Sequence, residues 1–279
     1  SLNAKSMPCA GRCDDPVPVL KGNQVLIGCD ASELKPMSSL LPPSNPGEIE
    51  ECVFAHIREE GRATLEGYRK TGGYAALEKA LCDSPENLVL LITESKLAGR
   101  GGAGFPTGKK WEMVAQAEGN PKTIVCNADE GEPGCFKDRT LLDYDPHATL
   151  EGMILAAYAT GATRGFIYLR YEYPDTMGIL ERAIAEAKAT GLLGQNIGGK
   201  AGVDFEIYIR RPKPVRGKTH LCRPCPIPAC LGVGSAPPFL QIVSLIPGLL
   251  QTFRLVSCHQ LRSIECSEYQ VQRGAWQAE

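Results

Sequence analysis

The chain has 279 residues, of which 43% are hydrophobic and 22% are charged, so it is long enough to bury one large core or two small ones. The formal net charge of -2 gives no electrostatic footprint for nucleic acid, and residues 1–13 lack the apolar segment of a secretory signal. We therefore expect a cytoplasmic protein whose twelve cysteines are thiols, metal ligands or iron–sulfur ligands rather than a disulfide framework.

Helices and strands are expected to alternate through the middle of the chain. Ser84 followed by Pro85 predicts a helix start, and a second helix is expected to open at Thr107 or Gly108 and to stop at Gly119. The later elements are a strand at 123–127, a helix at 150–160, a strand at 165–171, a helix from Asp175 to Gly191 and a strand at 203–209. This order predicts an α/β fold with a Rossmann-like, mainly parallel sheet and helices on both faces.

The stretch GRGGAGFPTGKKW at 99–111 lies between the first two of these helices. Its formal GxGxxG does not follow a strand, and Ala103 and Lys110 stand where a phosphate-binding P-loop needs Gly and Ser or Thr. A plain glycine linker is the remaining alternative, but linkers rarely carry a Phe-Pro step and paired lysines. A bare backbone, a helix start and a lysine together suit a flat phosphorylated ligand such as flavin mononucleotide (FMN).

A second polar stretch, NADEGEPGCFKDR at 127–139, follows the strand at 123–127. It gathers Asn127, Asp129, Glu130 and Glu132 at the carboxyl end of that strand, where open parallel sheets bind ligands. A solvated acidic turn is the alternative for this stretch taken alone. Beside the glycine loop, its amide and carboxylate oxygens instead favour binding of the hydroxyl groups of ribityl and ribose chains.

The two stretches together resemble the NADH-binding flavoprotein subunit of respiratory complex I. They are also similar to its soluble relatives, the diaphorase subunit of NAD-reducing hydrogenases and the β subunit of NAD-dependent formate dehydrogenases. The similarity continues through DPHATLEGMILAAYATGA, IYLRYEYP and GLLGQNIGGKAGVDFEIYIR and covers roughly residues 45–211. The resemblance implies an FMN that accepts hydride from NADH and passes electrons singly to iron–sulfur clusters of partner subunits.

The resemblance also implies a role for particular residues. Asn127 and Asp129 would lie on the ribityl and phosphate side of the FMN, Phe105 would stack on the NADH adenine, and Glu130 and Glu132 would be the catalytic pair near the nicotinamide half, with Lys110 also facing NADH. The residues implied to face the FMN from the glycine loop are Gly99, Arg100, Gly101, Gly102 and Lys110.

The amino terminus is similar to the closing half of the thioredoxin-like [2Fe-2S] domain that precedes this module in the hydrogenase and formate dehydrogenase branches. Cys9 and Cys13 would be two of the four cluster ligands, so we expect the earlier pair to lie before Ser1. Two reduced thiols on a loop are the alternative.

The composition changes sharply after Arg211. Residues 212–279 contain eight of the 21 prolines and carry about +4, whereas residues 1–211 carry about -6. The uncharged stretch 224–253 contains six prolines, so no transmembrane segment is expected. The Tyr-x-Cys-Gly-Glu-Glu segment of the resembled family is missing, which indicates a frameshift, a readthrough or a misjoined segment, with a genuine different domain as the alternative. Metal binding by the tail is weakly supported by Cys222, Cys225, Cys230, His220, Cys258 and His259.

These observations divide the chain into a thioredoxin-like remnant at 1–30, a linker and helical lead-in at 31–84, an incomplete FMN- and NADH-binding α/β domain at 85–211, and an irregular tail at 212–279. The expected function is that of an NADH:acceptor oxidoreductase, or diaphorase, module of a larger complex. A non-catalytic fragment, or an assembly module that binds partner subunits without oxidising NADH, is the alternative.

Overall fold

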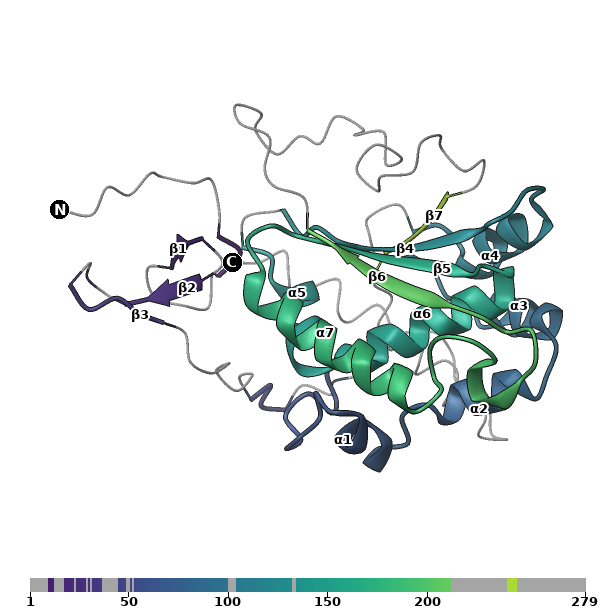
Figure 1. Cartoon of the computed structure of the whole chain (residues 1–279), viewed down its shortest axis with the longest axis horizontal. Coiled ribbons are helices and arrows are strands. Elements are labelled where there is room, and N and C mark those ends of the chain that lie inside the picture. Colours follow the sequence, from purple (N-terminus) through teal and green to yellow (C-terminus); the bar gives the residue numbers. More distant parts are fainter. Residues whose placement is uncertain are drawn as a thin grey trace.

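The computed structural model (Figure 1) describes residues 10–12, 18–22, 24–28, 30, 32–36, 45–48, 51, 53–99, 104–131 and 134–211, together with the backbone of 240–244. Within these ranges the molecule is a parallel sheet with helices packed against it, preceded by a small antiparallel sheet.

The parallel sheet has the order β6-β5-β4-β7. Its strands are β4 (Thr123–Ala128), β5 (Arg164–Leu169), β6 (Glu206–Arg210) and β7 (Leu240–Ser244). Thr123 pairs with Arg164 and Ala128 with Leu169, so β4 and β5 end at the same edge of the sheet. The first four residues of β4 are all buried, which is the pattern of a strand that is covered on both faces.

Helix α6 (Pro146–Thr160) is the centre of the core, with twelve of its fifteen residues buried. It contacts β4 and β5, and α7 (Pro174–Ala189) contacts β6, so the two helices lie on the same side of the sheet (Figure 1). On β6, Ile207 is buried and Tyr208 is 42% exposed, which is the alternation expected of a strand that is covered on one face.

Four helices precede the sheet in the chain and pack against α6 or against one another. They are α1 (Leu65–Lys70), α2 (Ala75–Leu81), α3 (Pro85–Glu94) and α4 (Thr107–Gln116). Glu151 of α6 joins this layer to the core, because its buried carboxylate accepts hydrogen bonds from the Tyr68 hydroxyl at 2.5 Å and from the backbone N–H groups of Tyr74 and Leu77 at 2.9 and 3.1 Å.

The small antiparallel sheet consists of β1 (Val19–Lys21), β2 (Gln24–Ile27) and β3 (Lys35–Pro36). Just before it, Arg12 forms a 3.0 Å ion pair with Asp175 of α7, and the carbonyl of Gly11 accepts a hydrogen bond from Arg139 at 3.1 Å. Gly11 has a φ of +65°, and a Cβ there would lie 2.5 Å from the Tyr173 ring, so only glycine fits this contact.

The expected α/β fold with a mainly parallel sheet is confirmed, with helices seen against one face among the described residues. The side chain of Ser84 caps α3 by accepting from the Asn87 N–H at 3.2 Å, as its sequence predicts. Helix α6 begins four residues earlier than expected, at Pro146, and β6 begins three residues later, at Glu206.

Several elements were not expected from the sequence, among them a helix and a strand. Helix α5 (Lys137–Tyr144) begins at the end of the polar stretch 127–139, and its N-cap position is Phe136, which offers no capping side chain. The strand is β7, because residues 212–279 were expected to be irregular and 240–244 form a strand between Pro238 and Pro247. The rest of that tail, with its candidate metal ligands, lies outside the described residues. In the part of the chain that the structure describes, no helix combines the length and the apolar character needed to cross a bilayer.

Candidate functional site

The base of the glycine loop is closed by backbone hydrogen bonds on both sides. The N–H of Gly99 donates to the carbonyl of Phe105, and the N–H of Thr107 donates to the carbonyl of Leu97, each at 2.8 Å. Gly104 has a φ of +60°, a conformation that favours glycine. Arg100, Gly101 and Gly102 lie outside the described residues, so the structure fixes where their loop leaves and rejoins the fold.

Helix α4 begins immediately after this loop, at Thr107, without a side-chain cap. The Thr107 hydroxyl oxygen is buried and has no hydrogen-bond partner among the described residues. Since the first turn of a helix leaves backbone N–H groups unpaired and carries partial positive charge, this helix start can hold an anion. Helices α3 and α4 lie very close together here, because a Cβ on Gly108 would lie only 2.6 Å from the Cα of Thr93.

The two lysines after Thr107 differ in position. Lys109 is exposed, whereas the half-buried Lys110 places its ammonium 5.8 Å from the centre of the Phe105 ring. Phe105 itself is 40% exposed, which leaves part of its ring open to a ligand. The structure therefore brings together two of the predicted site residues, Phe105 and Lys110.

The carboxyl end of β4 presents Asn127 and Asp129 to solvent and turns Ala128 and Glu130 inward. The N–H of Asp129 donates to the Asn127 side-chain oxygen at 3.2 Å, so the two exposed side chains are held next to each other. Successive side chains of an extended chain point to opposite sides, so residues 127 and 129 face one way and residues 128 and 130 face the other. Asn127 and Asp129 are thus exposed at the edge where open parallel sheets bind ligands, and their role in binding stays a prediction.

Glu130 lies inward, against the first turn of α5, and is only 8% exposed. Its carboxylate accepts backbone hydrogen bonds from Asp138 at 3.2 Å and from Arg139 at 3.3 Å, and the Tyr173 hydroxyl donates to it at 3.4 Å. Burial raises the pKa of Glu130, the nearby Asp138 carboxylate raises it further, and the two backbone N–H groups oppose the rise. In this arrangement the carboxylate caps a helix, and Glu132 lies outside the described residues.

Sequence reasoning missed the buried charged residues behind Glu130. Arg170 follows β5 directly, and its guanidinium donates to the main-chain carbonyl of Glu130 and, at 3.1 Å, to the carboxylate of Glu172. Both side chains are almost fully buried. The sequence does contain a pattern that could have indicated these residues. Arg170 and Glu172 come shortly after the apolar strand β5, just as Asp129 and Glu130 come directly after β4.

The metal-site predictions are not tested by this structure. Among the residues that it describes, no three His, Cys, Asp or Glu side chains gather where they could hold a metal ion. Cys9 and Cys13, the predicted cluster ligands, lie outside the described residues.

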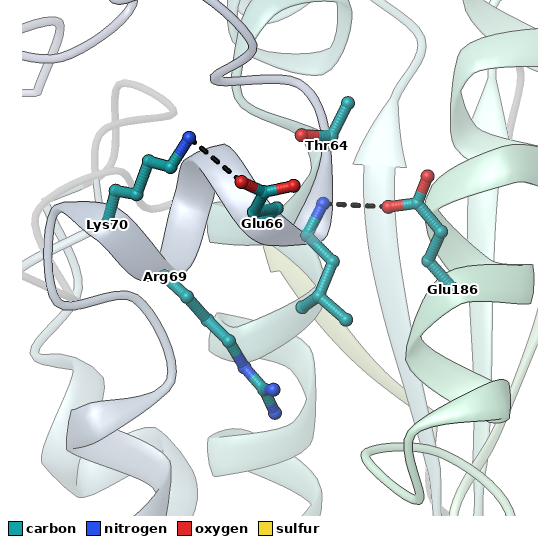
Figure 2. A pocket seen from close by; sticks show the side chains of 6 residues that line it. Thr64, Glu66, Arg69, Lys70 and Glu186 are labelled. Atoms are coloured by element: carbon teal, nitrogen blue, oxygen red, sulfur yellow. Dashed lines mark hydrogen bonds and ion pairs between the residues drawn. The ribbon is translucent and has the colours of Figure 1, made fainter.

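A pocket of about 710 Å³ lies beside α1 and is lined by none of the predicted site residues. In Figure 2, Lys70 forms a 2.9 Å ion pair with Glu66, and Glu186 accepts a hydrogen bond from the backbone N–H of Leu65 at 2.7 Å. We do not place the candidate site there.

Comparison with known proteins links the glycine loop and the carboxyl end of β4. Residues 92–220 match the family model described as the Nuo51 FMN-binding domain, and both stretches fall inside that range. Over this part, the chain is similar to the Nuo51 FMN-binding domain family.

Two curated relatives extend the family match. The chain is 53% identical over 148 residues to a subunit of the NADH-quinone oxidoreductase of Aquifex aeolicus, which covers 53% of this chain and 34% of that protein. It is 44% identical over 170 residues to the NAD-reducing hydrogenase HoxS subunit alpha of Cupriavidus necator, which covers 61% of this chain and 28% of that protein. The chain thus spans about a third of the length of the relatives it matches.

A solved structure supports the fold over a longer range. A chain of the NAD+-reducing [NiFe]-hydrogenase in the air-oxidized state superposes with a TM-score of 0.59 and 26% identity, covering 90% of this chain and 44% of that one.

The described residues within this matched range fit a flavin nucleotide. The start of α4 with the unpartnered Thr107 hydroxyl suits its phosphate, and the exposed oxygens of Asn127 and Asp129 suit its ribityl hydroxyl groups. The exposed Phe105 ring and the Lys110 ammonium beside it can receive a second aromatic or anionic group.

Proposed function

We propose that this chain is the FMN-binding, NADH-oxidising part of a larger NADH:acceptor oxidoreductase. The observation that carries the proposal is the Nuo51 FMN-binding family match over residues 92–220, which contains the closed glycine loop and the polar end of β4. The comparisons favour this function over the non-catalytic alternative, because both curated relatives are named as NADH- or NAD-linked oxidoreductase subunits.

In this proposal, Asn127 and Asp129 bind the ribityl and phosphate side of the FMN, and Lys110 with the start of α4 supplies positive charge to anionic groups. The loop residues Gly99, Gly101 and Gly102 allow close approach of the backbone to the flavin, and Arg100 of the same loop faces it. Bound FMN supplies a two-electron hydride acceptor that can release its electrons one at a time.

The protein's own contribution is to orient NADH and to exclude water from the face where hydride moves. Phe105 is proposed to stack on the adenine, and its 40% exposure leaves the ring free for that contact. Orientation by Glu132 near the nicotinamide half remains a prediction. For Glu130 the same role remains a prediction, and its inward carboxylate supports a narrower one, in which it holds the loop that carries Asp129.

We further propose that electrons leave toward iron–sulfur partner subunits, with Cys9 and Cys13 as ligands of one cluster. The parent complex is proposed to be of the complex I or NAD-reducing hydrogenase type, with formate dehydrogenase as a third candidate, and its location is proposed to be cytoplasmic. The two named relatives support the first two types.

Two measurements test the function. Titration of the chain with FMN, followed by quenching of flavin fluorescence, should show saturable binding. The FMN-loaded chain should then reduce ferricyanide with NADH, and Asn127→Ala with Asp129→Ala should weaken FMN binding by about tenfold or more, because each loses polar contacts to the ligand. A chain that binds no FMN, or one that binds FMN and shows no turnover at saturating flavin, contradicts the proposal and supports the assembly-module alternative.

A further inference from the structure

Arg170 lies at the junction of the two central strand ends, and it is 1% exposed. It follows β5 directly, and its backbone N–H donates to the carbonyl of Ala128 at 3.1 Å, which continues the pairing of β5 with β4 by one residue. Its guanidinium then reaches past the end of β4 to the main-chain carbonyl of Glu130.

Three contacts fix the plane of this guanidinium. One nitrogen donates to the Glu130 carbonyl, another donates to the Glu172 carboxylate at 3.1 Å, and the group lies 5.5 Å from the centre of the Tyr173 ring. Because guanidinium donors have a rigid fork geometry, the Glu172 contact determines where the nitrogen facing Glu130 points. A lysine ammonium could replace the charge but not this fixed direction.

Glu130 is consequently held from two sides. Arg170 binds its main chain, while the start of α5 and the Tyr173 hydroxyl bind its carboxylate. The Glu130 carbonyl belongs to the peptide plane that follows Glu130, and the Ala128 carbonyl, which accepts from the Arg170 N–H, belongs to the plane that precedes Asp129, so Arg170 fixes the main chain on both sides of the exposed Asp129. Arg170 thereby controls a residue that it does not itself touch in these contacts.

The cost of burying Arg170 and Glu172 argues for such a role. A buried ion pair generally gives little more stability than apolar residues of the same size, since both charges lose their hydration. The Arg170–Glu172 pair, whose side chains are only 1% and 4% exposed, is therefore expected to add little to the free energy of unfolding. The pair does, however, fix the position of one main-chain carbonyl, that of Glu130.

We propose that Arg170, anchored by Glu172, is a positioning residue that holds the 129–131 segment so that Asn127 and Asp129 present their oxygens to the bound nucleotide. The part of this inference that concerns the nucleotide rests on the proposed function. The part that concerns the segment does not, because it refers only to contacts within the chain.

The test compares Arg170→Lys with Arg164→Lys in the full chain. Arg164 is the exposed residue at the other end of the same strand, so it controls for the substitution itself. In the flavin-free proteins, hydrogen–deuterium exchange should be about tenfold faster or more in peptides covering 127–136 of Arg170→Lys, the change expected when one hydrogen bond to a charged group is lost. Exchange in α3 should stay as in the wild type for both variants.

Unchanged exchange in 127–136 would overturn the inference, as would an equal rise throughout the chain, since that would indicate a purely structural role. Where Arg170→Lys does not fold, Glu172→Gln decides by the same measurement, because it keeps the guanidinium and weakens its anchor by replacing the carboxylate with a neutral amide.

A second readout separates this inference from the proposed function. With FMN, Arg170→Lys should raise the dissociation constant by about tenfold, and kcat at saturating FMN should change much less. Equal losses in both parameters would contradict positioning. If the wild-type chain binds no FMN, the proposed function fails, and the exchange experiment still decides whether Arg170 holds the segment.

Discussion

The hydroxyl of Thr176 donates to a carboxylate oxygen of Asp143 at 2.5 Å and so joins α7 to α5 inside the protein. Arg139 donates to the other oxygen at 3.3 Å. Asp143 is fully buried, and this burial raises its pKa to about 6, although the Thr176 hydrogen bond and the Arg139 charge oppose the rise. A carboxyl group with this pKa changes its charge within the range where proteins are commonly handled.

The raised pKa of Asp143 predicts a pH dependence of stability. The folded state binds the Asp143 proton more tightly than the unfolded state does, so its contribution to stability is complete below about pH 4 and is lost as pH rises to about 6. Asp143→Asn removes this titration. We expect the free energy of unfolding of the variant, relative to wild type, to rise by about 3 kcal/mol between about pH 4 and pH 7. Urea unfolding of both proteins across this pH range measures the difference in their free energies of unfolding. A difference that does not change with pH would contradict the prediction.

Glu151→Leu should destabilise the chain strongly. It leaves the Tyr68 hydroxyl and the N–H groups of Tyr74 and Leu77 buried without an acceptor. Burial holds the pKa of Tyr68 well above its usual value, so that hydroxyl remains a donor. We expect a loss of about 3 to 5 kcal/mol in the free energy of unfolding. Glu181→Leu on the exposed side of α7 is the control and should change it by about 0.5 kcal/mol or less.

Gly108→Ala should separate α3 from α4. The added methyl group would lie 2.6 Å from the Cα of Thr93, and backbone cannot move away as easily as a side chain can. We expect a cost of about 1 to 3 kcal/mol, measured by thermal unfolding. Gly152→Ala in α6 meets nothing within 4 Å and should stabilise instead, by about 0.5 to 1 kcal/mol. Equal shifts in both variants would show that the contact with Thr93 is not limiting.

Lys110→Ala should weaken FMN or NADH binding more than Lys109→Ala does. Successive side chains on a helix point about 100° apart, and Lys110 turns toward Phe105 while Lys109 is exposed. We expect a loss of about 1.5 to 3 kcal/mol in binding free energy for Lys110→Ala, the usual range for a hydrogen bond to a charged group. Titration of both variants with FMN and with NADH provides the measurement, and equal losses would count against the geometry of the site.

The parts of the fold with local signals were predictable. Ser84 and Pro85 specify the start of α3, and the apolar run at 123–127 specifies β4, because capping and burial depend on neighbours in the sequence. Helix α5 was not predictable in this way. Its cap is Glu130, seven residues before its first residue, and Phe136 at the N-cap position carries no signal.

The candidate site could be predicted only in part from the sequence, for a similar reason. The sequence placed four polar residues at the end of β4, and chain alternation could have separated Asn127 and Asp129 from Glu130. The inward contacts of Glu130 also depend on Tyr173, which lies 43 residues away along the chain. Contacts of that separation are set by the pairing of β4 with β5, and no local pattern in either segment encodes them.

Residues 10–12 precede every helix of the described chain, yet their partners lie on α5 and α7. A domain boundary drawn between β1–β3 and the parallel sheet would seem suitable from the sequence alone. It would nevertheless separate residues that are in buried contact in the fold. It would remove Arg12 from Asp175 and the Gly11 carbonyl from Arg139. The portion of this protein that could be exchanged intact by recombination or by design therefore has to include Gly11 and Arg12, well before the first strand of the parallel sheet.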